Sequence, residues 1–455
     1  MERSTSALHT DHYELTMVAS ALKSGIAHHG AVFEVFARRL PAGRAYGVMA
    51  GIDRVLDAIS RFRFDAATVE HLVSHGVVQE GEMTDWLRSY RFSGDVTGYA
   101  EGELFFPYSP VITVTGTFAE CVVLETVLLS VLNHDCAVAS AAARMVDAAG
   151  GRLLIEGGSR RTDPESAVAA ARAGFVGGFD TTSNLEAGRR HGIPTGGTTA
   201  HAFVLAHESE EAAFAAQRDT LGAGSTYLVD TFDVMEGIRR AVATVGSDIG
   251  AVRIDSGDLL GDSVAARELL DSLGAIDCRI VVSSDLDEFS VAELEAANAP
   301  IDAYLVGTSL VTGSGHPTAS MVYKLVAIAP DTDPSSELRA VGKLSPGKRT
   351  IGGRKDVHRT VDSEGRFTGE ILSVLPIELP DDSMAPQVAL VRDGEIVADL
   401  TNPAEARARC AERRSRLDDL ARTPWPSHAP AIPTIWEGVE KPLSVPVAHV
   451  GGKGA

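Results

Sequence analysis

The chain has 455 residues, with 41 Lys and Arg against 62 Asp and Glu, and its formal net charge is −21. This acidity argues against general nucleic-acid binding, which needs basic patches for the phosphates, and against docking on anionic membranes. The length exceeds what one hydrophobic core usually fills and predicts two or three domains.

The compartment is indicated by the cysteines and the N-terminus. No uninterrupted apolar run reaches the roughly 18 residues that span a bilayer. The N-terminus carries charged residues instead of the apolar core of a signal peptide. Cys121, Cys136, Cys278 and Cys410 form no C-x-x-C pair, which favours neither a zinc knuckle nor a disulfide framework. These features predict a cytoplasmic protein with no membrane partner.

The first 120 residues predict a mixed α/β domain. Ala31–Phe36 is typical of a strand and Ile52–Ile59 of a helix. Leu104–Tyr108 and Pro110–Val114 are strand-like segments interrupted by proline. A buried helix is then predicted from Cys121 onward, because its apolar residues recur at helical spacing up to the glycines at 150 and 151.

A strand-then-helix rhythm follows. The predicted strands end near residues 230, 255, 284 and 307, in steps of 25, 29 and 23 residues. This rhythm predicts parallel strands joined by right-handed crossovers. The predicted strands are 152–155, 226–229, 249–254, 279–282 and 303–306, and the predicted helices are 164–175, 202–217, 234–245, 263–273 and 290–297.

Polar residues stand where these strands end, including Glu156, Asp230, Asp255 and Thr308. The carboxyl ends of strands build the active site of a (β/α) barrel, whereas an open doubly wound sheet binds mainly at one switch point. An irregular α/β barrel is therefore the preferred fold, with an open sheet as the alternative.

Residues 331–455 change character. Pro330–Glu337 predicts a surface loop, Lys343–Arg359 is locally basic, and Ala404–Leu420 predicts a charged helix. The proline-rich tail from Pro424 is expected to be loosely ordered. We therefore expect three units: an N-terminal domain over 1–120, an α/β barrel with the active site over 121–330, and a C-terminal extension over 331–455 that packs back on the N-terminal domain.

Two motifs stand out chemically. Gly196–His201 (GGTTAH) is a glycine-rich turn before a helical stretch, where free N–H groups can hold an anion and His201 can exchange protons or accept a phosphoryl group. Val252–Asp258 (VRIDSGD) places Arg253 and Asp255 at a strand end, suited to an anion and to sugar hydroxyls or Mg²⁺. A plain loop histidine and a simple Asp-Gly turn remain the alternatives.

Two further turns could hold phosphate. Gly307–Ser309 offers backbone amides and hydroxyls, and Gly157–Arg161 (GGSRR) adds paired arginines, although each also fits an ordinary turn. Asp11, Tyr13 and the Arg38–Arg39 pair indicate nothing by composition alone. Together the turns, arginines and strand-end acids predict a phosphorylated sugar substrate with Mg²⁺.

The chain resembles nicotinate phosphoribosyltransferases in a series of segments that occur in family order across residues 10–330. The segments are TDHYELTM (10–17), FEVFARRLP (33–41), LETVLLSVLN (124–133), GGFDTTSN (177–184), GIPTGGTTAHAFV (192–204), LVDTFD (228–233), VRIDSGDL (252–259), SSDLDE (283–288), YLVGTSLVT (304–312) and YKLV (323–326).

The resemblance implies a reaction and a fold. Nicotinate and phosphoribosyl pyrophosphate would give nicotinate mononucleotide and pyrophosphate, with Mg²⁺ and coupled ATP hydrolysis, as the first step of NAD salvage from nicotinate. The fold would be a mixed N-terminal α/β domain on an irregular α/β barrel with C-terminal additions. The assembly would be a homodimer in which each active site is completed by the neighbouring subunit.

The resemblance also implies roles for residues of this sequence. His201 would be phosphorylated by ATP, Asp230 would orient its imidazole, and Asp255 would hold ribose hydroxyls or Mg²⁺. The other residues that the resemblance places in substrate binding are Asp11, Tyr13, Arg160, Asn184, Thr198, Arg253, Ser283, Gly307 and Thr308. Among them, Tyr13 would stack on the pyridine ring in the neighbour's site, and Gly307 and Thr308 would bind the 5′-phosphate.

This sequence departs from the family pattern at Gly157, where relatives usually carry a bulky apolar or aromatic residue that can sandwich the pyridine ring. A smaller departure is Gly353, in GGRKD, where the family more often has Pro-Gly-x-Lys-Gln.

Several other functions fit these residues less well. Nicotinamide phosphoribosyltransferase needs a carboxylate for the substrate amide, whereas this chain has Asn184 at that position. Quinolinate phosphoribosyltransferases are shorter and lack the phosphorylated histidine. An aldolase would want a Schiff-base lysine, and the strand ends offer none. A non-catalytic sugar-phosphate-binding barrel is the remaining class, although His201, Arg253 and Asp255 are all present.

Overall fold

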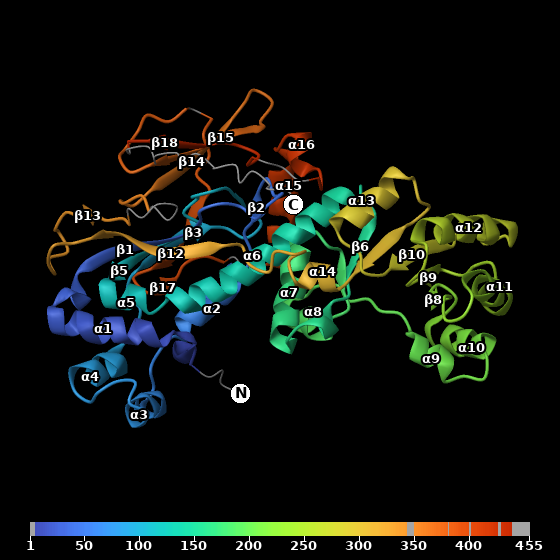
Figure 1. Ribbon diagram of the computed structural model, residues 1–455, viewed down its shortest axis with the longest axis horizontal. Helices are drawn as coiled ribbons and strands as arrows, with labels where there is room; N and C mark the ends of the chain where they lie inside the picture. The colour runs from blue at the N-terminus through green and yellow to red at the C-terminus, as the bar shows by residue number, and fades with distance from the viewer. Residues whose placement is uncertain (1–4, 344–349, 381, 400–401, 426–428, 439–455) are drawn as a thin grey trace, which may run out of the picture.

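The computed structural model describes residues 5–343, 350–380, 382–399, 402–425 and 429–438 (Figure 1). Two sequence-based expectations fall partly outside these residues. Lys348 and Arg349 of the basic stretch, and the prolines at 426, 442 and 446 of the tail, lie outside the described residues.

Two large sheets occupy opposite ends of the molecule (Figure 1). One has seven antiparallel strands in the order β13-β12-β1-β5-β3-β16-β17. Its strands are β1 (Gly30–Ala37), β3 (Asp95–Tyr99), β5 (Ile112–Thr117), β12 (Met321–Ile328), β13 (Arg339–Ala340), β16 (Gln387–Arg392) and β17 (Glu395–Ile396). The helices near it are α1 (His12–Ser24), α2 (Ile52–Ser60), α3 (Ala66–Ser74), α4 (Glu82–Ser89) and α5 (Phe118–Val122).

The other sheet has six parallel strands in the order β7-β6-β11-β10-β9-β8 and curls into half of a barrel (Figure 1). Its strands are β6 (Leu153–Glu156), β7 (Thr181–Thr182), β8 (Thr226–Leu228), β9 (Ala251–Ile254), β10 (Arg279–Ser283) and β11 (Ala303–Val306). The helices after them are α7 (Pro164–Gly177), α8 (Leu185–His191), α9 (His201–Leu205), α10 (Glu210–Leu221), α11 (Val234–Val245), α12 (Leu259–Ser272), α13 (Glu288–Ala296) and α14 (Thr308–Val311). The predicted α/β class is confirmed, and within the described residues the barrel is open between β7 and β8.

Helix α6 (Glu125–Ala148) joins the two halves. Its first part adds Leu128 and Leu132 to the core of the antiparallel sheet, and its second part adds Ala142 and Met145 to the core of the parallel sheet. The stretch Phe118–Ala148 is long and apolar enough to cross a membrane by length and composition, which corrects the expectation that no segment would be. Because 67% of its most apolar 18-residue segment is buried inside the protein, this stretch is a core helix of the fold.

The helix predicted over 202–217 is wrong as a single element. The chain leaves the helical path after α9, and Ser209 begins α10 by accepting a hydrogen bond at Oγ from the N–H of Ala212 (3.2 Å). Serine competes for backbone hydrogen bonds inside a helix but is favoured as an N-cap. The break leaves His201 at the start of a separate five-residue helix.

The part of the proline-rich tail that the structure describes around β18 (Thr434–Glu437) is more ordered than expected, because β18 pairs with β15 (Phe367–Ser373). Strand β15 in turn pairs with β14 (Asp356–Val361). In the remaining C-terminal part, α15 (Pro403–Ser415) packs against α7 and is followed by α16 (Asp419–Arg422). The short strands β2 (Gly47–Val48) and β4 (Leu104–Phe105) form a small ribbon.

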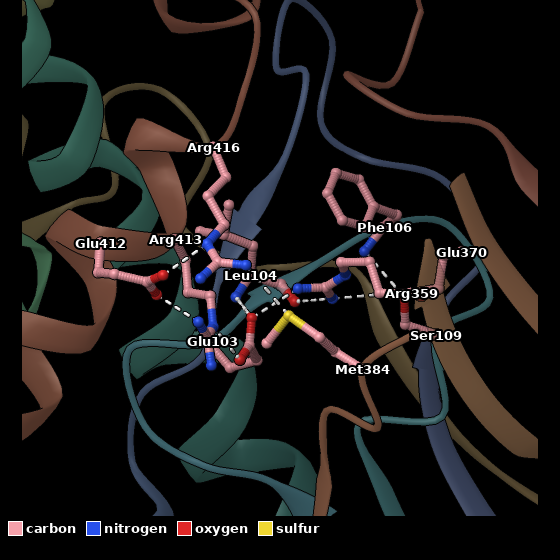
Figure 2. Close-up of polar contacts among 10 residues, drawn as sticks. All are labelled: Glu103, Leu104, Phe106, Ser109, Arg359, Glu370, Met384, Glu412, Arg413 and Arg416. Atoms are coloured by element: carbon pink, nitrogen blue, oxygen red, sulfur yellow. Dashed lines mark hydrogen bonds and ion pairs between the residues drawn. The ribbon is translucent and has the colours of Figure 1, made fainter. Parts of the chain in front are cut away.

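A buried ion network ties this C-terminal part to the N-terminal half (Figure 2). Arg359 of β14 contacts both Glu103, next to β4, and Glu370 of β15, while Arg413 of α15 contacts the other oxygen of Glu103. In addition, β12 and β16 lie in the antiparallel sheet beside β1 and β3. The division of the chain at residues 120 and 330 stays a prediction.

Candidate active site

The six-stranded sheet separates two environments. Tyr227, Val252 and Tyr304 point to the helix-covered face and are buried in one core. Because side chains alternate along a strand, their neighbours point to the opposite face, which we call the inner face. The register aligns Ser283 with Leu305, and Arg253 lies on the same face.

Arg253 connects several polar groups at the carboxyl edge of this face. Its Nε donates to Ser283 Oγ (2.9 Å), and its Nη2 donates to Asp255 Oδ1 (2.9 Å). Its Nη1 donates to Thr198 Oγ1 (2.8 Å) and to the carbonyl oxygen of Thr199 (3.4 Å). Arg253 therefore joins strands β9 and β10 to the glycine-rich loop before α9. The sequence predicted that this loop belongs to the site, but not that it contacts Arg253.

Asp255 is held in its ionised form. Ser283 also donates to its Oδ1. Burial alone would raise the pKa of Asp255, but hydrogen bonds from Ser283 and Arg253 and the positive charges of Arg253 and His201 outweigh it, so the pKa lies below its ordinary value. A carboxylate that stays charged can bind a cation or accept hydrogen bonds from sugar hydroxyls.

His201 lies opposite two carboxylates. Its Nε2 is 3.9 Å from Asp230 Oδ1 and 3.8 Å from Asp255 Oδ2, and its Nδ1 is 3.3 Å from Thr231 Oγ1. The side chain is 40% exposed, so the ring is open to a ligand on one side. The structure thus brings together the three residues predicted to be catalytic and adds Thr231, whose place in LVDTFD was the only sequence signal for it.

Asp230 is buried, with 2% of its side chain exposed. Its Oδ2 accepts from the N–H of Asp255 (2.9 Å) and from Ser256 Oγ (3.2 Å). Its Oδ1 has no hydrogen-bond partner among the described residues. A buried carboxylate oxygen without a donor is costly, which indicates that it serves a group that joins the site.

The two glycine turns lie side by side. The N–H of Gly157 donates to the carbonyl of Val306 (2.8 Å). A Cβ on Gly158 would stand 2.3 Å from Val311 Cγ1 and 2.9 Å from the oxygen of Gly307. Only glycine therefore fits this close approach, and the loops after β6 and β11, including Gly307 and the exposed Thr308, form one continuous rim.

A buried acid supports this rim and was noted in the sequence only as a polar strand end. Glu156 accepts hydrogen bonds from the N–H of Gly158 and from Thr182 Oγ1. Burial raises the pKa of Glu156, and these two hydrogen bonds offset part of the rise. Because both oxygens are engaged in fixing the turn, Glu156 supports the loop rather than facing the substrate.

The arginine turn after β6 faces solvent. Arg160 and Arg161 are exposed, and neither has an ion pair within the described residues. Asn184 caps α8 by accepting from the N–H of Ala187 (2.9 Å), and its Nδ2 donates to Ser159 Oγ (3.0 Å). Asn184 therefore links α8 to the turn that carries the free arginines.

Two predicted site residues lie elsewhere. Asp11 precedes α1 without capping it through its side chain, and Tyr13 is 45% exposed on α1. Figure 1 places α1 at the far end of the molecule from β9 and β10. Neither residue reaches the inner face of its own chain.

The carboxylates at this edge of the sheet are the candidate ligands for a metal ion. Within the described part of the chain, no group of three or more His, Cys, Asp and Glu side chains is placed to hold a metal. Asp230 Oδ1 lacks a partner, and Asp255 Oδ2 is not used by Arg253 or Ser283. Asp230 Oδ1 faces His201 Nε2, which leaves Asp255 Oδ2 for Mg²⁺. One carboxylate fits Mg²⁺, which takes one or two and completes its shell with water and phosphate oxygens.

The chain is similar in sequence to several known proteins of one family. Residues 8–133 match the family model of the nicotinate phosphoribosyltransferase (NAPRTase) N-terminal domain. The chain is 52% identical over 443 residues to nicotinate phosphoribosyltransferase pncB1 of Mycobacterium tuberculosis, covering 94% of this chain and 95% of that protein. It is 34% identical over 383 residues to nicotinate phosphoribosyltransferase of Bacillus subtilis, covering 82% and 77%.

The fold agrees as well. The crystal structure of human nicotinic acid phosphoribosyltransferase superposes with a TM-score of 0.79 at 24% identity, covering 94% of this chain and 97% of that chain. The likeness extends over both sheets and the C-terminal part. The chain therefore belongs to the nicotinate phosphoribosyltransferase family.

Proposed function

We propose that this protein transfers the phosphoribosyl group of phosphoribosyl pyrophosphate to nicotinate. The pyridine nitrogen forms a bond to the anomeric carbon, and the bond from that carbon to the pyrophosphate oxygen breaks, with its electron pair leaving on pyrophosphate. The observation that carries this proposal is the cluster of Arg253, Asp255, Asp230 and His201 at the carboxyl edge of the parallel sheet.

The transition state is cationic at the sugar, so positioning and electrostatics supply most of the catalysis. Asp255, held ionised, faces the side where ribose hydroxyls and positive charge would lie. Arg253 and the free Arg160 would take the anionic groups of the two substrates. Mg²⁺, held by the free Oδ2 of Asp255, would neutralise charge on the departing pyrophosphate when bound.

We also propose that His201 couples the reaction to ATP. Asp230 Oδ1 would accept the Nε2 proton of His201 and leave Nδ1 as the nucleophile for the γ-phosphoryl group, so that ADP departs. Water would later release phosphate, and the net reaction is hydrolysis of ATP. The unpartnered Oδ1 and the 3.9 Å separation from Nε2 support this role, because a small turn of the exposed ring closes the contact.

The first test is mononucleotide formation from phosphoribosyl pyrophosphate with nicotinate or nicotinamide, each with and without ATP. We expect product from nicotinate, stimulated by ATP in the wild type but not in His201→Ala. His207→Ala is the matched control, because His207 lies two residues after the same short helix and its Nδ1 contacts the carbonyl of Phe203 (2.7 Å). ³²P transfer from γ-labelled ATP to the wild type and not to His201→Ala would report the phosphohistidine directly.

The rival outcomes of this assay are distinct. Product from nicotinamide in place of nicotinate would establish nicotinamide phosphoribosyltransferase and refute the argument from Asn184. Phosphoribosyl pyrophosphate binding without product from either base would indicate a non-catalytic sugar-phosphate-binding protein. If ATP stimulates His201→Ala as much as the wild type, the transfer reaction is still supported but the phosphohistidine proposal is refuted.

We further propose that the enzyme acts in the cytoplasm in NAD salvage, as a homodimer with shared sites. The placement of α1 supports the dimer, because this helix, which starts after Asp11 and carries Tyr13, lies at the far end of the molecule from β9 and β10 (Figure 1). An exposed tyrosine provides a flat apolar face on which a pyridine ring can stack.

Subunit complementation tests the shared site. Tyr13→Ala and His201→Ala would each be poorly active alone, but a heterodimer of the two has one site with both residues intact. We expect tandem-tag-purified heterodimers to recover about half of the wild-type activity per dimer, since one of two symmetric sites is restored. Purified heterodimers no more active than the two parent variants would refute the shared site.

A further inference from the structure

Leu305 occupies an unusual position on the inner face. Its strand neighbours Tyr304 and Val306 are fully buried among the helices, whereas Leu305 is only half buried. It stands beside Ser283 on the next strand, and Ser283 binds both Arg253 and Asp255. Leu305 therefore presents an apolar surface within one strand spacing, about 4.8 Å, of the polar cluster.

The side chain leans over Gly157. An ideal Cβ on Gly157 would lie 2.5 Å from Leu305 Cδ2 and 3.1 Å from its Cγ. The space above the end of β6 is thus filled from β11, and a side chain at position 157 would have to displace Leu305. The two positions act as one unit, in which only one of them can carry a large side chain.

We propose that Leu305 forms the apolar wall on which the pyridine ring of nicotinate lies, in the space that Gly157 leaves open. The inference rests on the proposed function and names the residue that selects the flat ring. A heteroaromatic ring with a carboxylate needs an apolar surface for its face and a cation for its charge. Leu305 supplies the apolar surface and Arg253 supplies the cation. The two residues lie in one site because Ser283 stands beside Leu305 and accepts a hydrogen bond from Arg253.

The test moves the large side chain from position 305, on β11, to position 157, at the end of β6. Leu305→Ala is expected to raise KM for nicotinate about 10-fold, as for the loss of methylene contacts in a substrate pocket, with kcat and KM for phosphoribosyl pyrophosphate close to wild type. Gly157→Leu alone should also raise KM for nicotinate, because it displaces Leu305. The double variant Gly157→Leu/Leu305→Ala should recover most of the lost affinity, since it restores one large side chain in the same space.

Leu153→Ala is the matched control, because Leu153 is a leucine on the same face at the amino end of β6, and it is expected to leave all constants unchanged. Unchanged KM for nicotinate in Leu305→Ala, or a double variant worse than both singles, would overturn the wall while the transferase function stands. No product from nicotinate in the wild type would overturn the proposed function and the wall with it. If Leu305→Ala fails to fold, KM for nicotinate of the double variant decides: a value near wild type supports the wall, and a value above that of Gly157→Leu overturns it.

Discussion

Replacing Arg253 with alanine is expected to lower kcat/KM for phosphoribosyl transfer by about 10²–10³-fold, the range for losing one preorganised charged group in an active site. The wild-type side chain makes four hydrogen bonds, to Ser283, Asp255, Thr198 and the carbonyl of Thr199. Its loss would free the glycine-rich loop that leads to His201 and would remove a cation suited to the anionic substrates.

The pH dependence provides a second readout. Asp255 acts ionised, and its pKa is held low partly by the hydrogen bond and charge of Arg253. Without the arginine this pKa rises, so the acid limb of the profile of kcat/KM against pH should move to higher pH in Arg253→Ala. Arg253→Lys retains the charge but not the planar fork, and should recover the acid limb more fully than the rate.

Arg279→Ala is the control for charge alone, because Arg279 is an exposed arginine at the amino end of the neighbouring strand. Steady-state kinetics extended down to about pH 3, below the ordinary pKa of an Asp side chain, with melting curves for each variant, would check the prediction. An Arg253→Ala enzyme with wild-type kcat/KM and an unmoved acid limb would exclude Arg253 from both substrate binding and the positioning of Asp255.

The parallel half of the fold was predictable because its signals are local. The helix over Val234–Val245 and the strand over Ala303–Val306 have the bounds expected from apolar spacing and turn residues. The same parallel rule brings strand ends to one edge, and for that reason Asp230 and Asp255 could be expected to meet. The break between α9 and α10 was missed because Ser209 was not recognised as an N-cap.

Contacts over long sequence separations could not be predicted. Nothing local indicates that β12 pairs with β1, or that the tail supplies β18 to a small sheet. In the site, Arg253 and Thr198 were each predicted to bind substrate. Their contact could not be predicted, because Thr198 lies on a loop 55 residues before Arg253 that folds back onto it. Leu305 carried no signal because a leucine in a strand ordinarily packs in the core, and only the register and Gly157 give it another role.

Arg359 lies at the centre of the buried ion network in Figure 2. Arg359, with 2% of its side chain exposed, donates to Glu103 Oε1 (2.6 Å), Glu370 Oε2 (2.7 Å) and the carbonyl of Leu104 (2.9 Å). Its guanidinium lies 5.3 Å from the ring centre of Phe106 and 4.8 Å from that of Phe367. Arg359 thus pairs with two buried carboxylates from distant parts of the chain, and of these two Glu103 is also paired with Arg413.

Arg359→Met is expected to lower the free energy of unfolding by about 3–5 kcal/mol, because removing one partner leaves uncompensated buried charge. Urea unfolding would be followed by tryptophan fluorescence in a background with Trp86→Phe and Trp425→Phe. Trp436, whose ring lies 5.6 Å from that of Tyr108, would then report release of the C-terminal sheet. Arg366→Met is the matched control, because Arg366 pairs with Glu364 on the surface and such pairs contribute about 0–1 kcal/mol.

The charge explanation can be separated from lost packing by a second substitution and by pH. In Arg359→Met, Glu103 keeps its ion pair with Arg413, whereas Glu370 loses its cation. In Arg359→Met/Glu370→Gln this uncompensated charge is gone, so the double variant should be more stable than Arg359→Met. The deficit of the single variant should also shrink as the pH falls, because an uncompensated buried carboxylate has a raised folded-state pKa and its protonation then favours folding. A double variant less stable than the single one, with a deficit independent of pH, would show that Arg359 stabilises the junction through its contacts with Phe106 and Phe367 rather than through its charge.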